Sequence, residues 1–254
     1  MHPVFAATPG ARAAADVGSR IEARDCARAV ERLKEGLRKE YGEVELMAGT
    51  MYEHGVCVKR DWPRAVPFYV RAVEHGVREA ADRLAAGYAD PLNGPDMAAA
   101  LWWATRGRRF PPASLGISEG AAADPDRFVA ELRSWAPERL VRYTYVVGVL
   151  STVISELRYP ELAQRYGLGG EVLVRFFPAV PRIEVRSGER HEYQLLGVYN
   201  VNVLRDRRAR PVNNAFETLV EEIAARALKR YPQPPGLLPE EVVEARFIFF
   251  LEDE

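Results

Sequence analysis

One complete repeat unit of this chain is residues 61–95, DWPRAVPFYVRAVEHGVREAADRLAAGYADPLNGP. A shift of 36 positions places Asp25 on Asp61 and Tyr52 on Tyr88, and a further shift of 35 positions places Asp61 on Asp96. The apolar positions that coincide in the same way are Ala29 with Ala65 and Ala100, Val30 with Val66, Leu33 with Tyr69, and Leu37 with Val73. A fixed period of this length is the sequence signature of a repeat architecture.

The matching apolar positions fall three or four residues apart, as one face of a helix requires. In the first unit we expect one helix at about 25–40 and a second at about 43–53. A single helix pair cannot bury its apolar stripe, whereas stacked pairs can. The period therefore predicts an α-solenoid with a concave face.

The segment ELMAGTMYEHGVCVKRDWPRAVPFYVRAVEHGVREAADRLAAGYAD resembles the Sel1-like family of TPR-like repeats. The features that carry the resemblance are an alanine-rich second helix, a Tyr-x-x-Gly turn at 52–55 and a Val-x-x-Asp segment before the next first helix. DMAAALWWATRG resembles a third first helix, and the following RRFPPAS cannot continue as a helix because of its two prolines. The resemblance implies a helical repeat domain at 20–115, although the first unit lacks the usual aromatic residue.

In such a helix pair, Cys26 begins the first helix and Cys57 lies just past the end of the second. Both cysteines then lie at the same edge of an antiparallel pair, so we expect a disulfide between them. Inert free thiols are the alternative, followed by a catalytic or metal-binding role. No histidine stands at a zinc-ligand spacing from Cys57, and the two EHGV copies are interpreted as helix ends before a C-cap glycine.

A disulfide would indicate an oxidising compartment. The opening MHPVFAATPGARAAAD has neither the basic region nor the apolar region of an export signal, so we expect a signal or anchor to be absent from this chain. Its longest strongly apolar stretch, 146–154, is shorter than the roughly 20 residues of a membrane span. We therefore expect no membrane span.

A connecting segment with a short helix is predicted at 116–136. After it, the helical repeats give way to a mixture of helices and strands. A helix at about 138–157 is predicted, with Leu140, Tyr143, Val147, Leu150, Ile154 and Leu157 on one face. A short helix ELAQRY, a strand EVLVRFF, a strand LLGVYNVNVL, a helix NNAFETLVEEIAARALKRY and a final strand VVEARFIFFL follow. The predicted fold class is α+β.

This element order resembles the C-terminal domain of the TonB and TolA type over about 140–252, and we expect that domain at 137–254. The carrying features are RYPELAQRYGLGGEVLVRFF, the helix that begins near NNAF, the Pro-Pro at 234–235 and the apolar last strand. PAVPRIEVRSGERHEYQ departs from the family as an insertion or a longer hairpin, and DRRARPVNN replaces the usual Ser-Gly. The resemblance implies helices packed on an antiparallel three-stranded sheet, whose edge binds a partner peptide.

The partner-binding candidates are in three groups. The last strand provides Arg246, Phe247, Ile248, Phe249 and Phe250. Of Trp102 and Trp103, one ring is expected to face the solenoid core and the other solvent or the second domain, and an exposed Trp there would be a candidate anchor for a partner. Arg207 and Arg208 belong to a basic run that is interpreted as a solvated turn or as a contact for an acidic protein.

Charge and motifs narrow the function class. With 35 basic and 36 acidic residues, the whole chain has no field that would attract nucleic acid. Ser151, Ser155 and Ser187 lack a Gly-x-Ser-x-Gly context, and no glycine-rich phosphate loop is present. We therefore expect that the protein is not an enzyme and that it binds neither a cofactor nor a metal ion.

The sequence therefore predicts a non-enzymatic periplasmic protein that binds or scaffolds other proteins of the cell envelope. The alternative is an immunity or inhibitor protein that occludes a secreted toxin. A third possible class is a cytosolic regulator, in which we would expect Cys26 and Cys57 to be free thiols.

Overall fold

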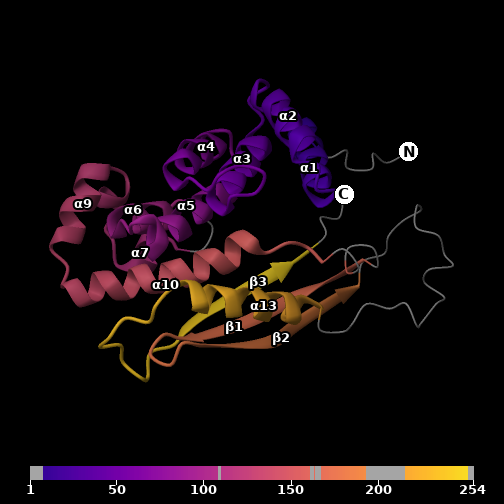
Figure 1. The fold of residues 1–254 in the computed structure, drawn as a ribbon. Helices are drawn as coiled ribbons and strands as arrows, with labels where there is room; N and C mark the ends of the chain where they lie inside the picture. The colour runs from indigo at the N-terminus through magenta and orange to yellow at the C-terminus, as the bar shows by residue number, and fades with distance from the viewer. Residues whose placement is uncertain (1–7, 108–109, 161–162, 164–166, 193–214, 251–254) are drawn as a thin grey trace. The chain divides into compact units, whose positions relative to one another are not determined.

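The chain is an α+β protein in a computed structural model, which is mostly helical and has one three-stranded antiparallel sheet (Figure 1). The structure describes residues 8–107, 110–160, 163, 167–192 and 215–250. The chain divides into two compact units, residues 1–151 and 152–254. The sequence-based boundaries at 20–115, 116–136 and 137–254 stay predictions.

The first unit is built from helices alone among its described residues. Their bounds are α1 Pro9–Glu22, α2 Cys26–Leu37, α3 Gly42–His54, α4 Trp62–Glu74, α5 Glu79–Ala89, the 3-10 turn η1 Pro91–Asn93, α6 Met97–Ala104, α7 Pro112–Leu115, α8 Glu119–Ala122 and α9 Pro125–Arg133. Helix α10, Pro137–Glu156, begins in this unit and ends in the second.

The aspartates that set the sequence period are helix N-caps. The Oδ1 atoms of Asp25, Asp61 and Asp96 accept the backbone N–H three residues later, at 3.2, 3.0 and 2.9 Å. Each bond satisfies one of the free N–H groups at the start of α2, α4 or α6. The period thus marks where each first helix of a pair begins.

A backbone bond recurs with the same period. The N–H of Asp61 donates to the carbonyl of Tyr52 at 2.9 Å, and the N–H of Asp96 donates to that of Tyr88 at 2.9 Å. Each bond fixes the loop after a second helix to the last turn of that helix. The two repeats therefore share a loop anchor as well as a helix start.

Helix α1 was not expected from the repeat pattern. Thr8 caps it by accepting from the N–H of Ala11 at 2.9 Å, and Pro9 occupies its first position. Val17 is fully buried against residues of α2 and α3. Helix α1 thus covers the first repeat, whose apolar face would otherwise meet water.

Tight helix packing in the second repeat depends on a residue without a side chain. A Cβ atom built on Gly87 of α5 would overlap the indole ring of Trp62 on α4. Trp62 also contacts Tyr88 edge-on, with 5.4 Å between ring centroids. The large aromatic ring fills the space that the glycine leaves.

The second unit contains β1 Leu168–Phe177, β2 Arg182–Glu192, α13 Ala215–Arg230 and β3 Val243–Phe249. The strand order is β2-β1-β3, and both pairings are antiparallel. Strand β2 forms within the segment that was interpreted as an insertion or a longer hairpin, and it pairs with β1 as a hairpin. The strand expected at 195–204 lies outside the described residues, as does nearly all of the short helix expected at 161–166.

Helix α13 lies over one face of the sheet (Figure 1). Val172, Val174 and Phe176 of β1 point to that inner face and are buried. Phe216 of α13 stacks on Phe249 of β3 with 4.4 Å between ring centroids. The alternation of β1 therefore leaves its other side chains on the outer face.

Helix α10 differs from the single apolar face that was predicted for it. All residues from Thr144 to Val153 are buried, whereas Leu140, Tyr143, Ile154 and Leu157 are only half-buried. A helix that is apolar on every side is a buried helix. Nearly all of the uncharged stretch 146–154, which was too short to span a membrane, thus lies in the buried middle of α10.

Candidate functional site

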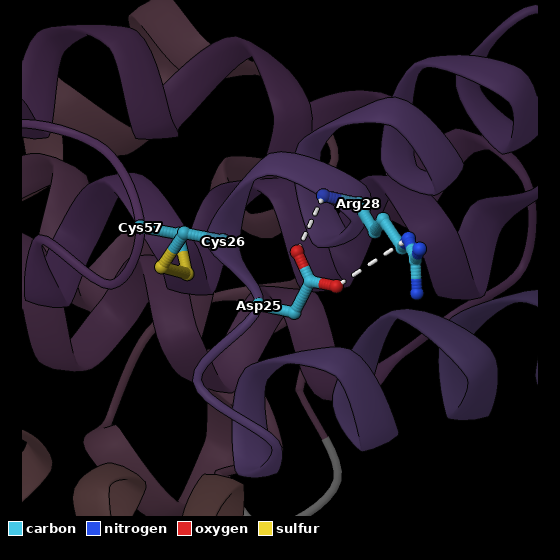
Figure 2. Close-up of a disulfide and its surroundings, with 4 residues drawn as sticks. All are labelled: Asp25, Cys26, Arg28 and Cys57. Carbon is cyan, nitrogen blue, oxygen red and sulfur yellow. Dashed lines mark hydrogen bonds and ion pairs between the residues drawn. A yellow bond between two sulfur atoms is a disulfide. The ribbon is translucent and has the colours of Figure 1, made fainter.

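The predicted disulfide between Cys26 and Cys57 is confirmed (Figure 2). Cys26 is the first residue of α2, Cys57 follows the end of α3, and their Cα atoms are 5.0 Å apart. Beside it, Asp25 caps α2 and also pairs with Nε of Arg28 at 3.5 Å. The covalent bond therefore joins the start of one helix to the loop that leaves its partner.

The loop that carries Cys57 has an uncommon backbone. Gly55 ends α3 with φ +70°, and Cys57 itself has φ +58°. The left-handed region disfavours residues with a Cβ by about 1–2 kcal/mol. The disulfide holds Cys57 in this conformation, so loop shape and covalent link are coupled.

A buried carboxylate that the sequence did not reveal joins α3 to α4. Glu45 is almost fully buried, and its carboxylate meets Nε of Arg71 at 3.0 Å and Nδ1 of His75 at 2.6 Å. The histidine of the second EHGV copy is therefore a partner of Glu45. Gly55 and Gly76 of the two copies both have positive φ, which confirms the C-cap interpretation.

A second buried carboxylate lies on the same helix. The hydroxyl of Tyr69 donates to Oε2 of Glu53 at 2.6 Å. Burial, and then the nearby charge of Glu53, raise the pKa of Tyr69 well above its usual value. Tyr69 therefore stays protonated and acts as a hydrogen-bond donor within the core.

The structure separates the candidates of the last strand into two sets. Phe247 and Phe249 point into the core, whereas Arg246, Ile248 and Phe250 are exposed. Ile248 is 46% exposed and Phe250 is 56% exposed. Among the strands that the structure describes, β3 has only β1 as a neighbour, so it forms an edge of the sheet.

The outer face of the sheet, opposite α13, carries a network of ion pairs. Arg175 of β1 lies 3.3 Å from Glu244 of β3 and 3.7 Å from Glu184 of β2. Arg246 lies 3.4 Å from Glu171, measured between side-chain N and O atoms. Charged side chains of both signs therefore surround the apolar residues of this face.

The two tryptophans both contact other residues. Trp103 is half-buried and packs against the cluster of α4 and α5 that contains Trp62. Trp102 meets Phe128 of α9 edge-on at 5.2 Å, and the Arg106 guanidinium lies 3.0 Å from its ring centroid. Arg207 and Arg208 lie outside the described residues. A binding role for these four residues stays a prediction.

Ser187, which was considered as a nucleophile, belongs to a polar contact between β2 and α13. Its hydroxyl donates to Oε1 of Glu217 at 2.6 Å, and Arg190 pairs with the same oxygen. Glu217 is buried in the first turn of α13. This contact fixes the helix against the edge strand of the hairpin.

Among the residues that the structure describes, no group of three or more His, Cys, Asp or Glu side chains could hold a metal ion. Within the same part of the chain, no helix is both long and apolar enough to cross a membrane. No protein-family model, curated protein or solved structure matches this chain. The candidate site is therefore defined by the geometry of its own residues: an exposed edge strand beside a charged sheet face, on a chain that a disulfide stabilises elsewhere.

Proposed function

We propose that this chain is a non-enzymatic protein of the bacterial periplasm that binds other proteins of the cell envelope. The observation that carries the proposal is the position of β3 at an edge of the described sheet, with Arg246, Ile248 and Phe250 exposed. An edge strand presents backbone N–H and C=O groups that a strand of another protein can pair with. The exposed side chains would then set which strand fits.

The resemblances noted in the sequence support the same function. In this proposal the first unit is a Sel1-like α-solenoid, and the second is a TonB-type or TolA-type domain with strand order β2-β1-β3. The disulfide supports an oxidising compartment, since disulfides persist there and are rare in the cytosol. An envelope protein of this kind recognises partners by shape and backbone pairing, with no chemical step.

The test compares three immobilised forms of the full chain in a pull-down from envelope extract, with quantitative mass spectrometry. Ile248→Lys places a lysine on the edge strand, a change that opposes strand pairing. Leu238→Lys makes a matched change at an exposed residue outside the sheet. We expect the wild type and Leu238→Lys to capture the same partner and Ile248→Lys to lose it.

Hydrogen exchange on the captured complex supplies a second measurement, because strand addition must slow exchange at amides of β3. Equal capture by all three forms would refute the use of this edge. A captured protein that is a secreted toxin would replace the scaffold role with the immunity role.

A further inference from the structure

The sheet face opposite α13 has an apolar residue at its centre. Val172 and Val174 of β1 are buried on the inner face, and Leu173 between them points outward with 41% of its surface exposed. Outward positions on a sheet with one solvated face are usually polar. Leu173 therefore forms an apolar floor among charged side chains of this face.

Two arginines flank this floor. The strand register places Arg186 of β2 and Arg246 of β3 directly opposite Leu173, one on each side. Their side chains are 67% and 59% exposed, and they lie 3.6 Å from Glu184 and 3.4 Å from Glu171. Because both arginine side chains are exposed, their guanidinium groups stay accessible to carboxylates of another molecule.

The outer face is hollowed at this place. A depression of about 300 Å³ is lined by Leu173, Val174, Arg175, Arg186, Glu244, Ala245 and Arg246. Such a volume accepts one or two side chains and lies at the small end of the range for binding pockets. An apolar floor between two cationic walls fits an apolar side chain with a carboxylate on each side.

The distance between the positions of Arg186 and Arg246 indicates whether a helix or an extended segment of a partner fits better. Two strand spacings separate the Cα atoms of Arg186 and Arg246, which is about 10 Å. In an extended segment, side chains on one face are about 7 or 13 Å apart. In a helix, residues seven apart are separated by about 10.5 Å, and a residue midway between them lies on the same face.

We propose that this outer face docks an acidic amphipathic helix of a partner protein. An apolar side chain of that helix sits on Leu173, and carboxylates on either side of it pair with Arg186 and Arg246. The surface is distinct from the β3 edge, although Arg246 borders both. The test therefore changes Leu173 and Arg186, which lie on β1 and β2, so that its failure is distinguishable from failure of edge binding.

The probe is a fluorescein-labelled, alanine-rich helical peptide with two glutamates seven positions apart and a leucine midway between them. Fluorescence anisotropy with the full chain is expected to show saturable binding that weakens with salt. Arg186→Glu should weaken binding at least tenfold, since it replaces attraction with repulsion. Lys229→Glu, the same charge reversal on α13, should leave binding unchanged.

Leu173→Ser tests the apolar floor and should also weaken binding of the leucine peptide. A matched peptide with serine in place of leucine should bind weakly to the wild type. Its affinity for Leu173→Ser should be the same as its affinity for the wild type. Circular dichroism checks that each variant is folded. Three results would each overturn the proposal: no binding by the wild type, equal losses in Arg186→Glu and Lys229→Glu, or equal affinity for the leucine and serine peptides.

Discussion

Gly49 of α3 lies directly against the ring of Tyr69 on α4: a Cβ atom built on the glycine would be 2.5 Å from Cδ1 and Cε1 of the tyrosine. Tyr69 is fully buried, and its hydroxyl is bonded to Glu53 on the same helix as Gly49. The ring is thus held at both its face and its hydroxyl end by α3. Helices α3 and α4 can approach closely only because position 49 has no side chain.

We predict that Gly49→Ala destabilises the first unit. The added methyl group must displace a ring that has no free space, and overpacking of this kind costs about 1–3 kcal/mol. Alanine's higher helix propensity offsets at most about 1 kcal/mol of this cost. Chemical denaturation followed by circular dichroism measures the change.

Gly120→Ala is the matched control for this prediction. Gly120 lies in α8, and a Cβ atom there would meet nothing within 4 Å. This substitution should leave the free energy of unfolding unchanged or raise it slightly. A loss of stability as large as that of Gly49→Ala would show that the contact with Tyr69 is not the cause.

The disulfide leads to a second prediction. The bond closes a loop with a sequence separation of 31, so the double change of Cys26→Ser and Cys57→Ser should lower the free energy of unfolding by roughly 3–4 kcal/mol. Replacing Cys57 by glycine instead should recover about 1 kcal/mol, because glycine adopts the left-handed backbone of this position without strain. Denaturant titrations of the two double variants measure the difference.

The redox state of the native protein provides a further check of the same bond. Protein isolated from its own compartment without reductant should show no titratable thiol after denaturation. Two free thiols per chain would remove the argument for an oxidising compartment. Identical stability of the serine and glycine double variants would contradict the strained backbone at Cys57.

The sequence predicted the repeat in the first unit because its signal is local. Asp25, Asp61 and Asp96 are N-caps, and a cap depends only on the residue and the three that follow it. Helix α1 was missed because it lies outside the period, although Thr8-Pro9 is a standard helix start. A search for a period identifies the repeated helices but not α1, which packs on the first repeat and is not itself repeated.

Tertiary contacts explain what the sequence did not reveal. The buried carboxylate of Glu45 depends on Arg71 of α4 and on His75 directly after it, which have no distinctive spacing to Glu45. The pattern around Leu173 becomes visible only when β1 and β2 are in register, and the sequence left open whether the β2 segment is an insertion or a longer hairpin. Cross-strand neighbours are set by register, which a single sequence specifies weakly when a turn is irregular.

The raised pKa of Tyr69 predicts how stability depends on alkaline pH. Because the folded-state pKa is above the unfolded value of about 10, the contribution of Tyr69 is fully present below pH 10. It is lost as the pH rises above that value, since only the unfolded state then releases the proton readily. The free energy of unfolding should therefore fall as the pH rises above 10, as measured by urea titrations at each pH.

Tyr69→Phe separates two roles of the hydroxyl: the hydrogen bond that it donates to Glu53, and its ionisation at high pH when the protein unfolds. At neutral pH the variant should be less stable by about 1–3 kcal/mol, because the buried carboxylate of Glu53 loses a hydrogen-bond donor. Above pH 10 its stability should fall less steeply than that of the wild type, because one tyrosine no longer ionises on unfolding. Tyr41→Phe, the same change at a half-buried residue, serves as the control. An equally steep fall in Tyr69→Phe and the wild type would show that Tyr69 does not carry the alkaline dependence, and that its hydroxyl is more accessible than its contact with Glu53 implies.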